Sequence, residues 1–281
     1  MSRIVPFEIP SSDGYPLRGK IHLPEGGLAP GVLLLHGFKG FMDWGFWPPI
    51  CERLAEAGLA ACRFNLSGSG VGEDDETFSE KDRFEANTYS REQDDIRIMI
   101  EALASGAIPG APTRPGEVGL LGHSRGGGMA VLAAAADPRV ASLVLWASIA
   151  TVQRYDENQI AALRKRGHMR VENARTGDVF RIRLDLLDDI EKNAEELDIF
   201  SAAASLEIPT LVIHGSGDEA VPYAEALALI GALGECGSFL PMEGAGHTFG
   251  AAHPMPDVMP LALEEVFEAS VTHLTAALLA D

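Results

Sequence analysis

The sequence of 281 residues contains few cysteines, little positive charge and no long apolar run. The three cysteines, Cys51, Cys62 and Cys236, form no CxxC pair, and an odd number without that spacing is typical of a reducing compartment. None of them stands in a turn with activating neighbours, so a cysteine nucleophile is not predicted. No stretch approaches the roughly 18 apolar residues that span a bilayer, and no signal peptide is visible. We therefore expect a cytoplasmic protein.

The scarcity of positive charge limits the partners. Lysine and arginine number 22 against 41 aspartates and glutamates, which gives a net charge of −19. Nucleic acids and anionic membranes bind basic patches, so this balance argues against both. No HExxH or comparable spacing predicts a metal site. The glycine-rich stretch at 65–76 does not match GxGxxG and contains acids that would repel phosphate, so no nucleotide cofactor is predicted either.

What the sequence does contain is an alternation of apolar strands and amphipathic helices. Segments 4–10 and 15–24 alternate apolar and polar residues around the turn SSDG, which predicts an antiparallel pair. The later strands are apolar runs, as expected of strands buried on both faces. They are predicted at 31–37, 59–65, 116–122, 140–148, 208–215 and 237–242. Helices are predicted at 47–58, 91–105, 125–136, 223–234 and 261–280. This order favours an α/β fold with a mostly parallel sheet and helices on both faces.

The alternation breaks at residues 151–206. This segment is charged and mostly helical in its spacing, with no strong strand. We interpret its acidic run at 185–198 as a solvated helix face. Residues 1–150 and 207–281 are therefore expected to form one core domain, and residues 151–206 a small helical cap inserted between two strands.

The stretch LLGHSRGGGMA (120–130) contains a Gly-x-Ser-x-Gly motif between a predicted strand and a predicted helix. A tight strand-to-helix turn strains its central residue and requires small neighbours, which Gly122 and Gly126 provide. The motif places Ser124 at the carboxyl end of a parallel strand, where open α/β sheets bind ligands. The N–H of Arg125, at the helix start, is a candidate donor to a developing oxyanion. Ser124 is the predicted nucleophile, and the alternative is a tight turn with a passive serine.

A serine nucleophile needs a base and a group that orients the base. Among the eight histidines, His247 in the loop GAGHTFG combines a flexible setting with the chain order Ser…Asp…His; His253 stays as the alternative. The acid is predicted to be Asp218, just past the strand in IHGSGDEAVP, with Glu219 beside it as the alternative. An aspartate there would reach the imidazole and fix its tautomer.

The stretches GHSRGG, LLLHGF and IHGSGDEAVP resemble the α/β-hydrolase superfamily, and within it the branch of dienelactone-hydrolase-like and cinnamoyl (feruloyl)-esterase-like proteins. The resemblance implies an eight-stranded twisted sheet and the same role for Asp218. It also implies that the N–H of Phe38 is the second oxyanion donor. Dienelactone hydrolases carry a cysteine nucleophile, so Ser124 fits an esterase better. Asn65 and Gly72 replace an aspartate and a serine that are common in these families, so no role is expected of those side chains.

Trp44 and Trp47 follow the oxyanion loop and are candidate substrate-binding residues, although core packing explains them equally well. The sequence predicts a serine hydrolase that cleaves small or medium acyl esters, or aromatic acyl esters, through an acyl-enzyme and without a cofactor. Ser-x-Gly-Gly also resembles prolyl-oligopeptidase-like proteins, so a peptidase or amidase is one alternative. A non-catalytic binding protein on a hydrolase scaffold is another. The expected partner is a small-molecule ester, and a homodimer is left open.

Overall fold

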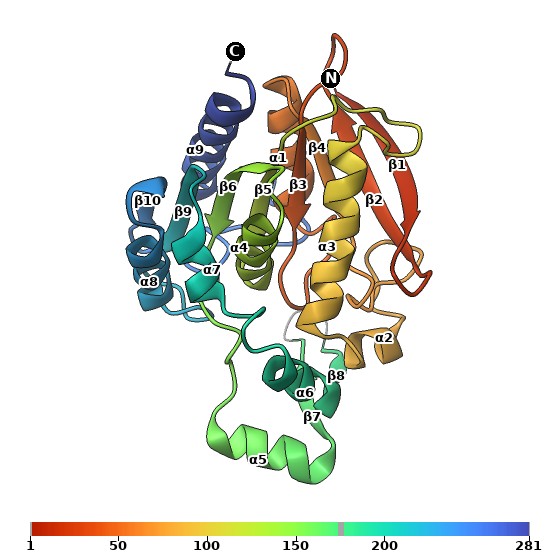
Figure 1. Ribbon diagram of the computed structural model, residues 1–281, viewed down its shortest axis with the longest axis vertical. Helices are drawn as coiled ribbons and strands as arrows, with labels where there is room; N and C mark the ends of the chain where they lie inside the picture. The colour runs from red at the N-terminus through yellow and green to blue at the C-terminus, as the bar shows by residue number, and fades with distance from the viewer. Residues whose placement is uncertain (1, 174–176, 281) are drawn as a thin grey trace.

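The computed structural model describes residues 2–173 and 177–280. An eight-stranded sheet crosses its centre (Figure 1). In spatial order the strands are β1 (Arg3–Pro10), β2 (Pro16–Leu23), β4 (Ala60–Phe64), β3 (Gly31–Leu35), β5 (Val118–His123), β6 (Val140–Trp146), β9 (Thr210–Gly215) and β10 (Gly237–Met242). Strand β2 pairs antiparallel with both of its neighbours, and every pair from β4 to β10 is parallel. The predicted sheet is confirmed, and each strand lies where a strand was expected.

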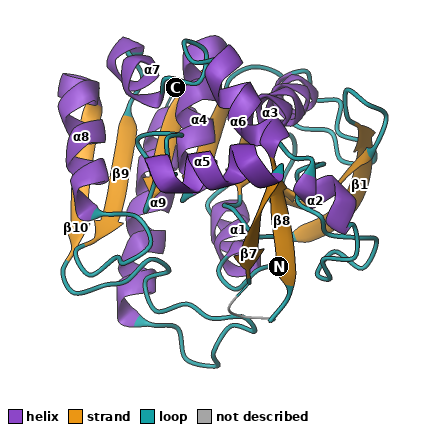
Figure 2. Ribbon diagram, turned by 90° about the horizontal axis from the view of Figure 1, so that it is seen from below, coloured by secondary structure: helices purple, strands orange, loops and turns teal. Residues whose placement is uncertain are grey.

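Helices cover both faces of this sheet because its central strands are apolar on both sides. Successive side chains of a strand point to opposite faces. In β3, Leu33 and Leu35 therefore enter one core, and Val32 and Leu34 enter the other. The first core is closed by α3 (Tyr89–Ala104), α4 (Arg125–Ala136) and α8 (Tyr223–Leu233), and the second by α1 (Trp47–Glu56) and α9 (Leu261–Leu278). Figure 2 shows the two sets of helices on opposite sides of the strands.

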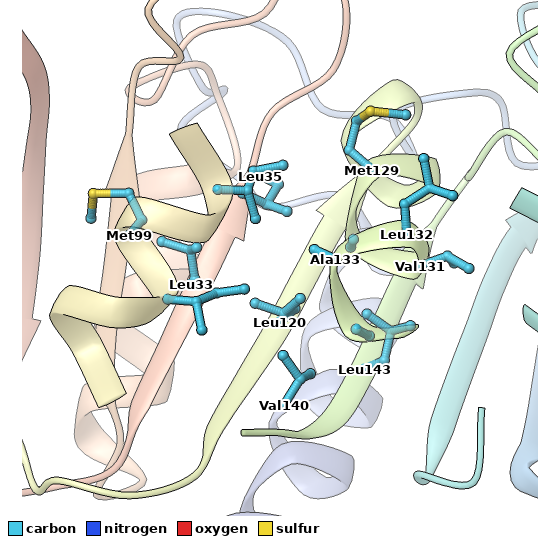
Figure 3. Close-up of a cluster of buried hydrophobic side chains, with 14 of the residues drawn as sticks. Leu33, Leu35, Met99, Leu120, Met129, Val131, Leu132, Ala133, Val140 and Leu143 are labelled. Carbon is cyan, nitrogen blue, oxygen red and sulfur yellow. The ribbon is translucent and has the colours of Figure 1, made fainter. Parts of the chain in front are cut away.

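The first core fixes α3 and α4 against the middle of the sheet. Figure 3 shows Leu33, Leu120 and Leu143 on three neighbouring strands, together with Met99 of α3 and Met129 of α4. All five side chains are fully buried. Their burial holds the helix that follows Ser124 close to the strand that precedes it.

Residues 151–206 contain strands that the sequence did not predict. In order, the segment holds α5 (Glu157–Arg166), β7 (His168–Glu172), β8 (Val179–Arg183), α6 (Leu184–Lys192) and α7 (Ile199–Ser205). Strands β7 and β8 pair antiparallel in a sheet of their own. The sequence indicated a mostly helical segment with no strong strand, so this short hairpin was not expected. Each strand has only five residues, which makes its signal short. Inward side chains such as Phe180 and Ile182 do alternate with the exposed Arg170 and Arg181, a strand pattern that could have been recognised.

The unpredicted hairpin and its neighbouring helices lie over the end of the sheet at which the parallel strands finish. Figure 1 shows α5, α6, β7 and β8 beyond the carboxyl ends of the parallel strands. Helix α7 instead packs against α4 and α8 of the main body. A short helix, α2 (Lys81–Glu85), was also not predicted, and it contacts β8. Among the helices of the described residues, none combines the length and apolar composition needed to cross a membrane.

Candidate active site

Ser124 occupies a strained turn between β5 and α4. Its backbone has φ of 59° and ψ of −121°, a conformation that costs a non-glycine residue about 1–3 kcal/mol. The surrounding chain holds it there: the Ser124 N–H donates to the Trp146 carbonyl (2.9 Å), and the Ser124 carbonyl accepts from the N–H groups of Gly127 (3.0 Å) and Ile149 (3.2 Å). The strained strand-to-helix turn predicted from the motif is confirmed.

The two glycines of the motif are required by close backbone contacts. A Cβ on Gly122 would lie 2.3 Å from the carbonyl oxygen of Gly126, and a Cβ on Gly126 would lie 2.3 Å from the carbonyl oxygen of Leu35. No Cβ tolerates either distance. The strand and the helix can therefore meet at Ser124 only because both positions lack side chains.

Asp218 and His247 meet beside this turn. His247 Nδ1 donates to Asp218 Oδ2 at 2.8 Å, and His214 Nε2 lies 3.3 Å from the same oxygen. The other carboxylate oxygen accepts from the N–H groups of Ala220 (2.8 Å) and Val221 (2.9 Å). Burial acts to raise the pKa of Asp218, but the hydrogen bonds from the two histidines and from Val221 outweigh it and hold that pKa far below its usual range. The carboxylate is thus ionised and fixed in direction.

The loop that carries His247 is held by a second histidine, which the sequence analysis did not assign a role. His123, the residue before Ser124, contacts the His247 ring with 4.6 Å between ring centroids. Its Nε2 donates to the backbone carbonyl of His247 at 2.9 Å. The side chain of His247 itself is 23% exposed, so it is open to the cavity while its backbone is anchored.

The alternative base, His253, lines the same cavity as Ser124, but its ring contacts other residues. His253 Nδ1 accepts from the Gly45 N–H at 3.1 Å, and its Nε2 lies 4.0 Å from Glu76. Glu219 is exposed. The structure therefore brings together Asp218 and His247 and neither alternative.

The loop after β3 passes directly against Ser124. A Cβ on Gly37 would lie 2.9 Å from Ser124 Cβ and 3.4 Å from Ser124 Oγ. In the turns and loops of the described residues, no hydrogen bond to a backbone carbonyl uses the N–H of Phe38 or of Arg125 as its donor. Both candidate oxyanion donors therefore belong to segments that adjoin Ser124, and neither is committed to another backbone carbonyl there.

His36 stabilises this loop through two hydrogen bonds of its neutral imidazole. Its Nδ1 donates to the Gly37 carbonyl (3.0 Å), and its Nε2 accepts from the Leu66 N–H (3.3 Å). Burial lowers the pKa of His36 to about 4, so the ring keeps one donor and one acceptor at neutral pH. This pairing ties the loop to the chain segment that follows β4.

Ser124 and His247 open into the same cavity, which has a volume of about 840 Å³. Trp44 and Trp47 also line it. The two tryptophans are 6% and 2% exposed, and Trp47 stacks parallel to Trp146 with 5.8 Å between ring centroids. The indoles are thus core residues and cavity walls at the same time.

A buried arginine lies at this cavity, and sequence reasoning assigned a role only to its backbone. The guanidinium of Arg125 stands 4.3 Å from the ring centre of Phe38 and 4.6 Å from that of Tyr89. Its Nη1 donates to Glu92 Oε1 at 3.1 Å. The sequence pattern could have indicated a buried cation. Glu92 falls four residues before Ile96 on the apolar stripe of α3, and a buried carboxylate requires a partner.

Other chemistries find little support in the described residues. Among them, no group of three or more metal-ligating side chains stands together. Cys51 and Cys62 are buried, free thiols. Burial raises the pKa of Cys51 to about 11, which suppresses the reactive thiolate.

Comparisons with known proteins agree with this fold. A model of the alpha/beta hydrolase family matches residues 32–260. Over 209 residues the chain is 27% identical to the 2,6-dihydropseudooxynicotine hydrolase of Paenarthrobacter nicotinovorans, covering 74% of this chain and 49% of that protein. The chain therefore spans about half the length of this relative.

Two solved structures illustrate the likeness of fold. A putative hydrolase from Agrobacterium vitis S4 has a TM-score of 0.74 at 18% identity, covering 97% of this chain and 99% of that chain. Est1E from Butyrivibrio proteoclasticus, solved with ferulic acid bound, has a TM-score of 0.70 at 20% identity, covering 96% and 99%. At these identities the similarity concerns the fold alone.

Proposed function

Because the chain belongs to the alpha/beta hydrolase family, we propose that it is a serine hydrolase that cleaves carboxylic esters. The observation that carries this proposal is the 2.8 Å hydrogen bond between His247 and Asp218, at a cavity that Ser124 also lines. A serine, a histidine and a carboxylate in this relation form the unit that activates a hydroxyl for acyl transfer.

In the proposed reaction, Ser124 Oγ attacks the ester carbonyl carbon while His247 Nε2 takes the hydroxyl proton. Asp218 accepts from Nδ1, so the tautomer with a free basic Nε2 is favoured, and the carboxylate stabilises the imidazolium that forms. The negative charge that develops on the carbonyl oxygen is received by the N–H groups of Phe38 and Arg125.

The tetrahedral intermediate then collapses. The ester C–O bond breaks, and His247 gives its proton to the departing alkoxide, which leaves as an alcohol. The acyl group stays on Ser124. Water, deprotonated by His247, attacks the carbonyl carbon of this acyl-enzyme. The bond between that carbon and Ser124 Oγ then breaks, His247 returns the proton to Oγ, and the carboxylic acid leaves. No cofactor takes part in these steps.

The size and walls of the cavity support a substrate of small or medium acyl groups, or of aromatic acyl groups. Its volume of about 840 Å³ lies within the range of small-molecule sites. Trp44 and Trp47 contribute aromatic side chains to its lining, which suits an aromatic acyl group such as that of the ferulic acid bound to Est1E. The hairpin of β7 and β8 contributes Val171 and Ile182 to the lining, so the inserted segment acts as a cap that shapes the pocket.

The proposal is tested by labelling with a fluorophosphonate, which reacts with activated serines. The wild-type protein is expected to be labelled and Ser124→Ala to stay unlabelled. Equal labelling of the two proteins would place the nucleophile elsewhere, and no labelling of the wild type would favour a binding protein without catalysis. Rates on 4-nitrophenyl esters and on aminoacyl anilides then separate an esterase from a peptidase, and faster ester cleavage is expected.

A further inference from the structure

The cavity at Ser124 is lined by cations, although the chain as a whole is strongly acidic. Its described lining residues include Lys39, Arg125 and Arg154 and no aspartate or glutamate. The net charge of the chain is −19, so the average surface of this protein is acidic. A cleft lined by charge of one sign concentrates ligands of the opposite sign. The lining therefore favours an anionic ligand.

Both arginines are held by carboxylates that lie outside the lining. Glu92 accepts from Arg125 at 3.1 Å and is 3% exposed. Glu225 accepts from Arg154, which also donates to the Ala220 carbonyl at 3.3 Å. A guanidinium has five N–H donors, more than these bonds use. The carboxylates thus fix the direction of the guanidinium groups and do not themselves face the ligand.

Tyr89 adds a buried donor at the same cavity. Its side chain is fully buried and lines the cavity, and its hydroxyl has no hydrogen-bond partner among the described residues. Burial raises the pKa of Tyr89 to about 12, so the phenol keeps its proton at neutral pH. A buried donor without an acceptor is unfavourable, and a ligand oxygen that accepts from it removes this cost.

We infer that the substrate carries, in addition to its ester bond, an anionic group of the carboxylate class that Tyr89 and Arg154 bind in the cavity. A carboxylate offers two oxygens with several lone pairs, which match a hydroxyl donor and the fork of a guanidinium. The inference rests on the proposed function, because it specifies which esters the same site takes. A neutral ester of equal length lacks the group and leaves the Tyr89 hydroxyl without a partner.

The inference is tested with two pairs of esters that differ in one charge. In the first pair, the anion is on the acyl side: 4-nitrophenyl hydrogen adipate against 4-nitrophenyl hexanoate. In the second, it is on the alcohol side: 4-acetoxybenzoate against 4-methylphenyl acetate. We expect kcat/KM to be at least about tenfold higher for the anionic member of one pair. This ratio should fall at high salt, which screens the attraction. Equal or lower rates for the anionic member in both pairs would overturn the inference.

Variants identify the groups responsible. Tyr89→Phe and Arg154→Gln are each expected to lower the anionic-to-neutral ratio about threefold or more. Arg97→Gln is the matched control, since Arg97 is an exposed arginine of α3 paired with Asp94 and does not line the cavity. It should leave the ratio unchanged. An equal fall of the ratio in Arg97→Gln and Arg154→Gln would show a general charge effect and contradict the assigned site.

A binding measurement separates this inference from the proposed function. Ser124→Ala is titrated by calorimetry with monomethyl adipate and with methyl hexanoate. Tighter binding of monomethyl adipate supports the anion site even if no ester is hydrolysed. Serine-dependent hydrolysis of neutral esters, together with no preference for the anion in binding or rate, would remove the anion site and leave the esterase proposal standing.

Discussion

Asp218 accepts hydrogen bonds through both oxygens of its carboxylate. One oxygen accepts from His247, and the other accepts from the N–H groups of Ala220 and Val221. An asparagine would keep the size of the side chain but could not offer two accepting oxygens. The NH2 group of the asparagine would have to face either His247 or the two backbone N–H groups. These are all donors, so a hydrogen bond would be lost in either orientation.

Asp218→Asn is therefore expected to lower kcat by about 10⁴ while the fold stays intact, because the imidazole loses its correct tautomer. Steady-state rates on a 4-nitrophenyl ester and far-UV circular dichroism check this. Glu219→Gln, a neighbouring exposed acid, is the control and should leave kcat unchanged. A loss of kcat in Asp218→Asn of less than tenfold would move the orienting acid elsewhere.

The raised pKa of the Asp95 carboxyl predicts that the stability of the fold depends on pH. Burial raises the pKa of its carboxyl to about 6, although the N–H of Ser67 donates to Oδ2 at 2.8 Å. The folded state thus binds this proton more tightly than the unfolded state, and stability is lost as the pH rises from about 4 to about 6. Asp95→Asn removes the charge and should gain up to about 3 kcal/mol over the wild type at pH 8, with little gain at pH 4.

Urea unfolding of the wild type and Asp95→Asn at pH 4 and pH 8 measures this difference. A gain that is the same at both pH values would mean that the ionisation of Asp95 is not its source. The carboxylate stands on the buried side of α3, so its sequence position, like that of Glu92, interrupts an apolar stripe.

The turn between β5 and α4 was predictable in detail because a short motif contains its whole physical requirement. Strand, serine, two glycines and helix are contiguous in the chain, and the geometry at Ser124 depends on little beyond them and the end of β3. The hairpin of β7 and β8 was not predictable in the same way. Its strands have only five residues each, so their alternating pattern is short, and Phe180 of β8 packs on Phe78 and Phe84, which are distant in the sequence.

Gly126→Ala tests the close contact of strand and helix. Its Cβ would lie 2.3 Å from the Leu35 carbonyl oxygen, so we expect a loss of about 3 kcal/mol in unfolding free energy and a loss of activity from displacement of Ser124. Gly231→Ala is the matched control. Gly231 stands in α8, where an added Cβ would meet no atom within 4 Å, and alanine there should stabilise by up to about 1 kcal/mol.

Thermal unfolding and the rate of ester hydrolysis are measured for both glycine variants and compared with the wild type. Wild-type stability and activity in Gly126→Ala would mean that the helix and strand separate without cost, and the account of the strained turn would be wrong.

The complete cavity assembles from segments that lie far apart in the sequence. Arg125 follows Ser124, Tyr89 comes from α3, and Arg154 comes from the segment before α5. The sequence indicated Ser124, His247 and Asp218, to which we assign the proposed roles of nucleophile, base and acid, because each stands in a local motif. It could not predict that Arg154 joins Tyr89 and Arg125 at the cavity wall, because that depends on how the inserted segment packs on the main body.

That packing is centred on Phe180 of β8. Its ring is fully buried and lies 4.5 Å from the Phe84 ring and 5.3 Å from the Phe78 ring, centroid to centroid. Phe180→Ala is expected to loosen the hairpin at a local cost of about 3–5 kcal/mol and to raise KM for esters about tenfold. Labelling of Ser124 by a small fluorophosphonate should persist.

Phe200→Ala is the control for this change, because Phe200 lies on α7 and is 52% exposed. It should leave KM unaltered. An unchanged KM in Phe180→Ala would show that the hairpin does not shape the substrate pocket.

The central claim is that Ser124 carries the acyl group during turnover. Wild-type protein mixed with a 4-nitrophenyl ester, quenched in acid and digested is expected to yield the peptide that contains Ser124 with the mass of one added acyl group, and Ser124→Ala should yield no acylated peptide. An acyl group found on another residue of the wild type, or rapid ester hydrolysis by Ser124→Ala, would contradict the account.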